Sequence, residues 1–398
     1  METAQAQRKK LAQARRVVVK VGTSTLTHPD GKLNLPQMKR LTREISALHR
    51  EGREVILVSS GAVGAGVGRI GAKAGHIKSI PQKQALAAIG QGALMRLYEE
   101  FFDGFGLNVA QVLLTRQDLE DRKRYVNARN TFLWLLRWKV VPIVNENDTV
   151  AVEEIRFGDN DTLSALVAGL VDADLLVLLS DVDGLYDGDP HRGGGFRLIP
   201  LVEKITPQVE SLARGTGSGL AIGGMTTKIT AARIATDCGV PMVIANGQKP
   251  GVLARVVAGE LVGTLFCAGT GLSGRRKWIL YGNRPVGTLV VDDGAKKALV
   301  ESGKSLLPSG LLEVQGEFEM GNVVRVRDRN GIEFARGITN YAAEDLDRIK
   351  GLHSRQINRV LGYDYGEEVI HRDNLVLVTD SQDLDGLEEE IVDQGTKS

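Results

Sequence analysis

The stretch Val17-Val18-Val19-Lys20-Val21-Gly22-Thr23-Ser24 decides the fold class. Its consecutive β-branched residues favour a strand, and the Gly-Thr-Ser that follows favours a turn. A strand that is apolar on both faces is typical of a parallel sheet covered by helices. Lys20, at the end of this strand, could hold a phosphate between its ammonium group and the N–H groups of the loop. Taken alone, the segment equally allows a lysine that only reaches solvent.

Beyond this strand, apolar runs and helical patterns alternate along the chain. The alternation predicts an α/β fold with a mostly parallel sheet. In such a fold, ligand-binding loops lie at the carboxyl ends of the strands. The predicted strands after the first are residues 54–59, 108–114, 140–144, 175–179 and 240–244. The predicted helices are residues 36–50, 82–102, 118–138, 161–171 and 225–238.

The pattern changes after Phe266. A stretch rich in Gly, Ser and Thr is interpreted as a linker, and short strands separated by turn residues follow it, which predicts a small β-rich second domain. These short strands are expected at residues 278–281, 287–291, 311–315, 322–326 and 333–338. The predicted organisation is a flexible N-terminus at 1–14, a larger domain at 15–266, a linker at 267–276, the β-rich domain at 277–372 and an acidic tail at 373–398.

The composition is that of a globular protein, with 42% hydrophobic and 25% charged residues. Residues 1–275 carry 34 Lys and Arg against 27 Asp and Glu, an excess of positive charge that favours an anionic small-molecule substrate. Cys238 and Cys267 form no CxxC motif, which argues against a zinc site and fits a reducing cytoplasm. Because no apolar run reaches about 18 residues and no secretion signal is recognised, we expect a soluble cytoplasmic protein.

A loop rich in Ser and Gly follows the second predicted strand. Ser60 and Gly61 are candidate donors to a carboxylate or phosphoryl oxygen, and the later glycines suggest close approach of the backbone to a ligand. Residues 66–71 match G-x-G-x-x-G, but the match begins well after the strand. No acidic residue stands where a ribose hydroxyl would need one, so a nicotinamide cofactor is disfavoured.

Two clusters of Asn and Asp follow in succession, Asn145–Asp148 and Gly158–Asp161. Such residues commonly serve as helix caps and turn formers. Capping explains one cluster more readily than two, so we favour a functional role. Asp and Asn side chains together could grip the ammonium and carboxylate groups of an amino acid. One of the aspartates could also orient a lysine or approach Mg²⁺.

The last candidate segments are Ser180-Asp181 at the end of a buried strand and the glycine loop that leads to Lys228. Because this loop opens a helix, its free N–H groups and the helix dipole could hold polyphosphate. It is not a Walker A loop, since Thr227 precedes Lys228 where that motif has Gly. A flexible glycine-rich connection is the alternative interpretation.

Taken together, these segments resemble the amino acid kinase family over residues 16–266. The most specific parts are the Lys20 strand, Asn145–Asp148, Gly158–Asp161, Asp183–Tyr186 and Gly223–Lys228. The C-terminal region, with Trp278, Ser305–Gly310 and Leu361–Gly366, resembles a PUA domain.

The resemblance implies a three-layer αβα sandwich and ATP with Mg²⁺ as the phosphoryl donor. It also implies phosphorylation of the γ-carboxylate of L-glutamate to L-glutamyl 5-phosphate, the first step of proline biosynthesis. Proline would then be a feedback inhibitor, and we expect a homo-oligomer. By matched position, Ser60, Asp148 and Asn160 would bind glutamate. The residues implied for ATP are Lys20, Ser180, Asp181, Ile222, Gly223, Gly224, Met225, Thr226, Thr227 and Lys228.

The expected mechanism assigns catalysis to Lys20, Lys228 and Asp161. The two lysines, with N–H groups of Gly22 and Gly61, would hold the moving phosphoryl group, and Asp161 would orient the lysines. No metal site of the protein's own is expected, because Mg²⁺ arrives with ATP. The sequence departs from the family pattern at Ile222, where a threonine is common.

Two alternatives remain open on the sequence. Another amino acid kinase specificity is the first. The second is an RNA-associated protein, since PUA-like domains occur in RNA-modifying enzymes. Residues 276–372 carry 15 basic against 14 acidic residues, which does not favour RNA. Arg325, Arg327 and Arg329 could form a local basic stripe, although such a stripe is more often a solvated sheet face.

Overall fold

The computed structural model divides the chain into two compact units, Met1–Ser273 and Gly274–Ser398. It describes residues 2–28, 32–71, 79–151, 160–188, 196–214, 224–268, 285–363 and 365–378. Several sequence predictions lie outside the described residues. They are the strand at 278–281 with Trp278, Gly158, Asp159, Ile222, Gly223, most of the linker and the tail after residue 378.

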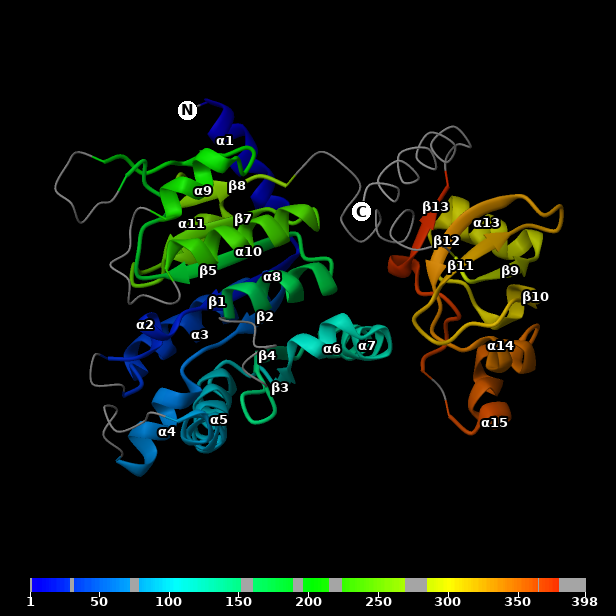
Figure 1. Ribbon diagram of the computed structural model, residues 1–398, viewed down its shortest axis with the longest axis horizontal. Helices are drawn as coiled ribbons and strands as arrows, with labels where there is room; N and C mark the ends of the chain where they lie inside the picture. Colours follow the sequence, from blue (N-terminus) through cyan, green and yellow to red (C-terminus); the bar gives the residue numbers. More distant parts are fainter. Residues whose placement is uncertain are drawn as a thin grey trace, which may run out of the picture. The chain divides into compact units, whose positions relative to one another are not determined.

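The first unit is built around one eight-stranded sheet with the strand order β3-β4-β2-β1-β5-β7-β8-β6 (Figure 1). Neighbouring strands are parallel except β7 and β8, so the prediction of a mostly parallel sheet is confirmed. The strand that contains Lys20 is β1, near the middle of the sheet. The strands are β1 (Arg16–Val21), β2 (Glu54–Val58), β3 (Val109–Leu114), β4 (Val141–Glu146), β5 (Leu175–Ser180), β6 (Leu201–Val202), β7 (Met242–Asn246) and β8 (Thr264–Phe266).

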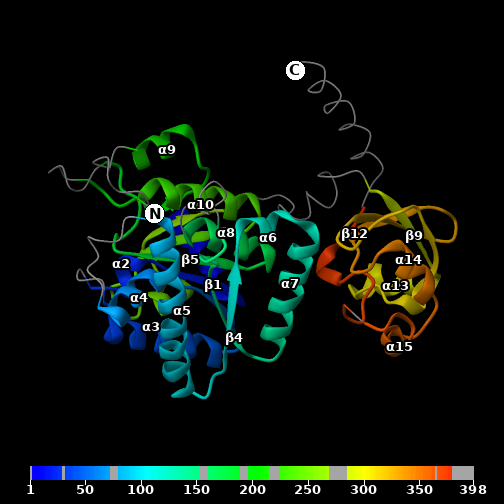
Figure 2. The ribbon, with the colours of Figure 1, turned by 60° about the horizontal axis from the view of Figure 1, so that its bottom comes forward.

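Alternate residues of the central strands enter two separate hydrophobic cores. Val17 and Val19 of β1 pack with α3 (Leu35–Arg50), α5 (Ile80–Asp103) and α11 (Val252–Val257). Val18 instead packs with residues of the helices on the opposite face, which are α7 (Arg122–Arg137), α8 (Asn160–Leu170) and α10 (Met225–Asp237). Figure 2 shows α8 and α10 on one side of β1 and β5 and α3 on the other. The three-layer αβα sandwich is therefore confirmed.

The single helix expected at residues 118–138 is two helices. α6 (Arg116–Glu120) ends at Asp121, and α7 begins there because the Asp121 carboxylate accepts a hydrogen bond from the Arg124 N–H at 2.9 Å. An aspartate at this position caps a new helix start. The remaining described helices of this unit are α1 (Glu2–Lys9), η1 (Lys10–Gln13), α2 (Thr23–Leu26), α4 (Ala62–Ile70) and α9 (Pro207–Arg214).

We predicted a flexible N-terminal segment at residues 1–14. In the structure this segment forms α1 and η1, which pack against the rest of the first unit. The Arg8 side chain is fully buried, and its guanidinium group donates to four backbone carbonyls. Arg8 is followed by Lys9 and Lys10, and nothing in this basic run indicates that one of its side chains is buried. A buried guanidinium needs acceptors, and only the folded chain supplies them. The acceptors are the carbonyls of Pro200 at 2.9 Å, Glu260 at 3.0 Å, Val262 at 2.7 Å and Gly263 at 2.8 Å.

Two glycines allow α4 and α5 to cross in close contact. A Cβ atom on Gly66 would lie 2.0 Å from the Leu86 carbonyl oxygen, and one on Gly90 would lie 1.8 Å from the Ala62 carbonyl oxygen. The prediction that the glycines after Gly61 approach a ligand is therefore wrong for Gly66, which approaches the backbone of α5. The G-x-G-x-x-G match lies within α4 and its C-cap, not at the turn after β2, which removes its value as a nucleotide signature.

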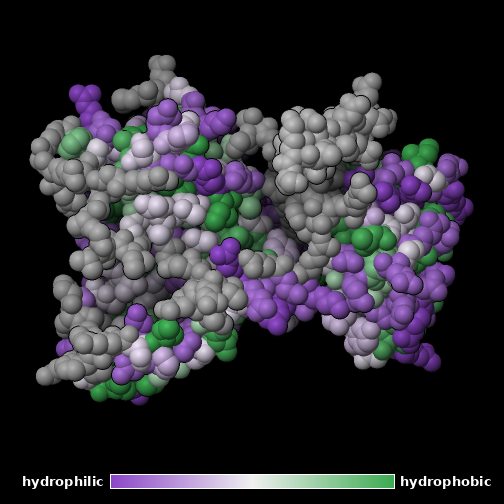
Figure 3. Space-filling view, viewed as in Figure 1, coloured by the Kyte–Doolittle hydropathy of each residue, from purple (hydrophilic) through white to green (hydrophobic). Residues whose placement is uncertain are grey.

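The second unit contains a five-stranded sheet with the order β10-β9-β11-β12-β13, which confirms a β-rich domain. β13 pairs with β12, so the ordered strands continue beyond residue 372, where the acidic tail was expected to begin. In the view of Figure 3, the surface of the second unit is mostly hydrophilic, with hydrophobic residues in small groups. Its elements are β9 (Gly287–Val291), α13 (Asp293–Ser302), η5 (Pro308–Gly310), β10 (Leu311–Gln315), β11 (Val323–Arg327), β12 (Glu333–Ile338), α14 (Ala343–Ile349), η6 (Ser354–Gln356), α15 (Ile357–Leu361), η7 (Arg372–Asn374) and β13 (Leu375–Leu377).

Among the helices that the structure describes, none combines the length and the apolar character that crossing a membrane would require.

The close crossing of α4 and α5 predicts opposite effects for two glycines of one helix. Gly90→Ala should lower the free energy of unfolding by about 1–3 kcal/mol, because the added methyl group overlaps the backbone of α4. Gly92→Ala is the control, since a Cβ there meets nothing within 4 Å, and alanine should stabilise the helix by about 0.5–1 kcal/mol. Urea-induced unfolding measures both; equal effects at the two positions would contradict the close crossing.

Candidate active site

The carboxyl ends of four strands meet at one edge of the sheet. β1 lies between β2 and β5, to which it is parallel, and β4 follows β2. The chain leaves β1 toward β2 and later returns to β5 on the other side, so β1 marks a point where the strand order reverses. In open α/β sheets, ligands bind in the crevice outside the strand ends at such a point. The four candidate segments at these strand ends are therefore brought to one edge.

Lys20, Asp161 and Lys228 form a buried cluster at this edge. Asp161 Oδ1 forms an ion pair with Lys20 Nζ, and Asp161 Oδ2 lies 3.1 Å from Lys228 Nζ. The three residues are 6%, 1% and 8% exposed. Thr227 Oγ1 donates to the same Asp161 Oδ2 at 3.1 Å. Two ammonium groups share one carboxylate, so the cluster keeps a net positive charge that can attract an anion.

The shared carboxylate is held in its ionised form. Burial by itself raises the pKa of Asp161, but the charges and hydrogen bonds of Lys20 and Lys228 outweigh this effect and leave the pKa below its ordinary value. A carboxylate with a lowered pKa is a poor proton acceptor. Asp161 is therefore placed to orient the two lysines and is poorly suited to act as a general base.

A chain of hydrogen-bonded amides lies beside the cluster. Asn160 precedes Asp161 at the start of α8, and its Nδ2 donates to Ser60 Oγ at 2.9 Å, to the Ser59 carbonyl at 2.7 Å and to Asn145 Oδ1 at 2.9 Å. Asn145 Nδ2 in turn donates to Gln91 Oε1 at 2.9 Å. This chain joins the ends of β2 and β4 to α8 and α5.

A third group lies at the ends of β5 and β7. Ser180 Oγ donates to Asp181 Oδ1 at 3.0 Å. Asp183 Oδ1 accepts from Asn246 Nδ2 at 2.9 Å and lies 2.8 Å from Lys249 Nζ. The hydrogen bond from Lys249, with that from Asn246, holds the pKa of Asp183 below its ordinary value despite partial burial.

The structure brings together the predicted residues Lys20, Asp161, Lys228 and Thr227, and separately Ser60 and Asn160. Gly224, Met225 and Thr226 lie at the start of α10, just before Thr227. Gly61 has φ 95°, a left-handed conformation that glycine adopts readily, and it precedes α4. Asp148 is half-buried in the turn after β4, and no described contact joins it to Asn160. Ile222 and Gly223 lie outside the described residues.

Sequence reasoning placed Asn145 in the first Asn and Asp cluster but missed three other residues of this edge. Asn246 ends β7, and its position at a strand end was the available signal. Lys249 follows β7 in a turn. Gln91 offered no local signal, because it lies inside a long helix and only its contact with Asn145 marks it.

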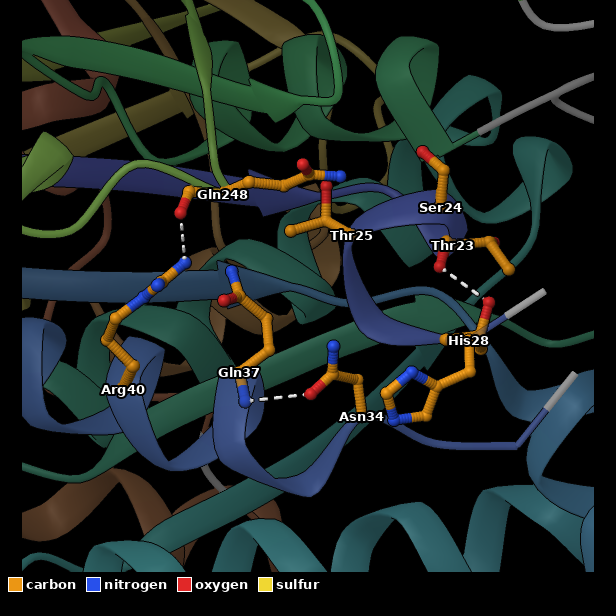
Figure 4. Close-up of a pocket in the computed structure, with 9 residues that line it drawn as sticks. Thr23, Ser24, Thr25, His28, Asn34, Gln37, Arg40 and Gln248 are labelled. Carbon is orange, nitrogen blue, oxygen red and sulfur yellow. Dashed lines mark hydrogen bonds between the residues drawn. The ribbon is translucent and has the colours of Figure 1, made fainter. Parts of the chain in front are cut away.

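A cavity of about 700 Å³ opens on the α3 side of the sheet (Figure 4). Figure 4 shows side chains from α2, α3 and the loop after β7 around it, with Arg40 donating to the Gln248 carbonyl at 2.7 Å. Lys228 and Asp161 belong to helices on the opposite face of the sheet, so this cavity is not where the lysines meet. Its lining residues are Thr23, Ser24, Thr25, Thr27, His28, Asn34, Gln37, Arg40 and Gln248.

Comparison with known proteins identifies the family. Residues 15–246, more than half of the chain, match the model of the amino acid kinase family. The chain belongs to the amino acid kinase family. The match includes Lys20, Asp161 and Lys228 as well as the amide chain. Residues 287–361 match the PUA domain, within the second unit.

Curated relatives of this amino acid kinase are similar over nearly its whole length. It is 54% identical over 369 residues to a protein named glutamate 5-kinase from Moorella thermoacetica, covering 92% of this chain and 97% of the relative. Proteins of the same name from Carboxydothermus hydrogenoformans and Geobacter sulfurreducens are 55% and 50% identical, each covering 92% of this chain and 99% of the relative. The crystal structure of UMP kinase from Bacillus anthracis aligns with 65% of this chain and 98% of its own, at 18% identity and a TM-score of 0.46.

The buried cluster predicts an acid-dependent stability. Because the folded pKa of Asp161 is lowered, its stabilising contribution is present above the ordinary value of about 3.9 and is lost as pH falls through the folded value. Asp161→Asn should lower the free energy of unfolding of the first unit by about 3–5 kcal/mol at pH 7. The difference from wild type should shrink below about pH 4, as measured by urea unfolding at pH 7, 5 and 3.

The exposed Asp103, at the end of α5, provides the control. Asp103→Asn should change the free energy of unfolding by less than about 0.5 kcal/mol at each pH. A difference between wild type and Asp161→Asn that stays constant from pH 7 to pH 3 would show that the carboxylate is not held ionised by the lysines.

Proposed function

We propose that the protein transfers the γ-phosphoryl group of ATP to the γ-carboxylate of L-glutamate and forms L-glutamyl 5-phosphate, the first step of proline biosynthesis. The relatives named glutamate 5-kinase support the substrate, since they align over more than nine-tenths of the chain. The observation that carries the chemistry is the buried pair of lysines on one carboxylate, Lys20 and Lys228 on Asp161.

The reaction needs charge neutralisation more than proton transfer. A γ-carboxylate is already ionised at neutral pH, so no general base is required. The obstacle is the approach of this anion to the anionic γ-phosphate. Lys20 and Lys228 would hold the phosphoryl oxygens as charge shifts in the transition state, and Asp161 would keep the two ammonium groups in place.

The two sides of the cluster suggest two subsites. On the β2 and β4 side, Ser60, Gly61, Asp148 and Asn160 would bind glutamate. On the β5 and β7 side, Ser180, Asp181 and the start of α10 from Gly224 to Lys228 would bind ATP. By matched position, Ile222 and Gly223 would bind it as well. The Thr227 hydroxyl donates to Asp161. We therefore propose that Thr227 positions this carboxylate in addition to binding ATP.

Mg²⁺ would enter with the phosphates of ATP and neutralise part of their charge. Asp161 fits the metal poorly, because both of its oxygens already face lysine ammonium groups. The described residues contain no group of three or more His, Cys, Asp or Glu that could hold a metal ion. We therefore assign the ion to the nucleotide rather than to a site on the chain.

Three further expectations belong to this proposal. Proline, as the end product of the route, would be a feedback inhibitor. The protein would act in the cytoplasm, in keeping with Cys238 and Cys267, which are both free thiols. It would also form a homo-oligomer.

The PUA match leaves RNA binding by the second unit as the alternative, and the contacts there do not favour it. Arg325 Nε lies 3.2 Å from Glu333 Oε2, and Arg336 Nε lies 2.7 Å from Glu333 Oε1. Glu333 thus offsets part of the positive charge that a basic stripe on β11 would need.

A hydroxamate assay identifies the acceptor. With ATP, Mg²⁺ and hydroxylamine, the acyl phosphate product is trapped as a hydroxamate that iron(III) colours. We expect product with glutamate and none above background with N-acetylglutamate or aspartate. Product with another acid only would replace glutamate as the substrate, and no product with any acid would remove the proposed function.

Replacement of either lysine by methionine tests the clamp, since methionine keeps much of the buried aliphatic side chain. Lys20→Met and Lys228→Met should each lower kcat by about 10²–10³-fold, the usual loss for one transition-state donor. Lys139→Met is the control, because Lys139 precedes β4 at the opposite edge of the sheet and should keep kcat within about 2-fold. A decrease in kcat of less than a few-fold for the Lys20 or Lys228 variant would contradict the role assigned to that lysine.

A further inference from the structure

One face of α5 reaches the ends of two strands at the amino acid side of the site. Gln91 and Tyr98 lie two turns apart on this helix and therefore on the same face. Tyr98 OH is 2.8 Å from Ser59 Oγ, and Gln91 Oε1 accepts from Asn145 Nδ2 at 2.9 Å. Gln91 is 8% exposed and Asn145 is 3% exposed.

Backbone groups at both ends fix the orientation of every side-chain amide in this row of hydrogen bonds. The N–H of Glu146 can only donate, and it lies 2.9 Å from Asn145 Oδ1. The amino group of Asn145 must therefore face Gln91, which must present its oxygen. At the other end, the Ser59 carbonyl can only accept, so the Asn160 amino group faces it. The two ends agree, and none of the three side-chain amides can be reversed without opposing two like groups.

This orientation decides what Asn160 can offer a ligand. Its two N–H hydrogens already serve three protein acceptors, on Ser59, Ser60 and Asn145. Its donor capacity is therefore used within the protein. Among the described contacts, Asn160 Oδ1 has no protein donor, so the group left for a ligand is an acceptor. An acceptor suits an ammonium group and not a carboxylate.

The presence of Gln91 at this position lowers the stability of the folded state. Its Nε2 is buried and has no hydrogen-bond partner within the described structure. A buried donor without an acceptor destabilises the folded state, and an apolar residue of the same size would avoid that loss. The Gln91 oxygen is the only acceptor that the described contacts give the Asn145 amino group.

We propose that Gln91 is a positioning residue for substrate selection: by accepting from Asn145, it fixes the Asn145–Asn160 pair so that Asn160 Oδ1 receives the α-ammonium group of the amino acid substrate. Gln91 acts through Asn145 and does not touch the substrate. The assignment rests on the proposed function, and it adds the feature by which an α-amino acid is preferred over the same diacid without an amino group.

The test compares glutamate with glutarate, which lacks the ammonium group. Gln91→Met keeps the length of the side chain and removes the acceptor oxygen. It should raise the KM for glutamate about 10-fold, leave the KM for ATP within about 2-fold, and leave the inhibition constant of glutarate within about 2-fold. Gln91→Asn stays polar but is too short to reach Asn145, so it should behave in the same way and serves if the methionine variant does not fold.

Gln37→Met is the matched control. Gln37 is also 8% exposed and makes a hydrogen bond of its own, from Nε2 to the Gly247 carbonyl at 2.7 Å, outside the amide chain. The KM of the Gln37→Met variant for glutamate should stay within about 2-fold of the wild-type value. An unchanged glutamate KM in the folded Gln91 variants, or equal weakening of glutamate and glutarate, would overturn the proposal. Wild-type protein without activity on glutamate would instead overturn the proposed function, and this assignment with it.

Discussion

The carboxylate of Asp161 is the interaction on which the rest of the site depends. Two lysines buried side by side would repel each other and lose their hydration, a cost of several kcal/mol per ion. Asp161 offsets this cost by facing both ammonium groups at once. It thereby ties β1, α8 and α10 together at one point. The cluster still carries one positive charge in excess, so its stability and its attraction for an anion have the same origin.

The position of this cluster follows from the order of the strands. Lys20 is the residue before the last of β1, and the strand order reverses at β1, with β2 on one side and β5 on the other. Helices α8 and α10 cover the same face of the sheet, so their first turns converge on the end of β1. On the other face, Gly66 and Gly90 let α4 and α5 touch backbone to backbone. That contact brings α5 close enough for Gln91 and Tyr98 to reach the ends of β4 and β2.

The polar side chains at this edge of the sheet have fixed donor and acceptor orientations as well as fixed positions. The chain from Gln91 through Asn145 to Asn160 runs from an N–H of the backbone to a carbonyl of the backbone, and each amide has one permitted orientation. Next to it, the lysine cluster presents only donors. In the proposed function, an amino acid with an ammonium group at one end and a carboxylate at the other would meet an acceptor on the first side and cations on the second. Such a polarity would favour a substrate that reacts at its distal carboxylate.

From the sequence alone one could predict the α/β class, most of the strands, the long helices of the first unit and the four polar segments at strand ends, because these features depend on patterns within a few residues. Short elements such as α4, α9, α11 and β8 were not predicted. It also placed Lys20, Asp161 and Lys228 among the candidates. Only the tertiary structure decided that one carboxylate serves both lysines, since Lys228 and Asp161 are 67 positions apart. Gln91, the burial of Arg8 and the packing role of Gly66 likewise had no local signal. Each depends on a partner brought close by the sheet, and such partners exist only once the chain has folded.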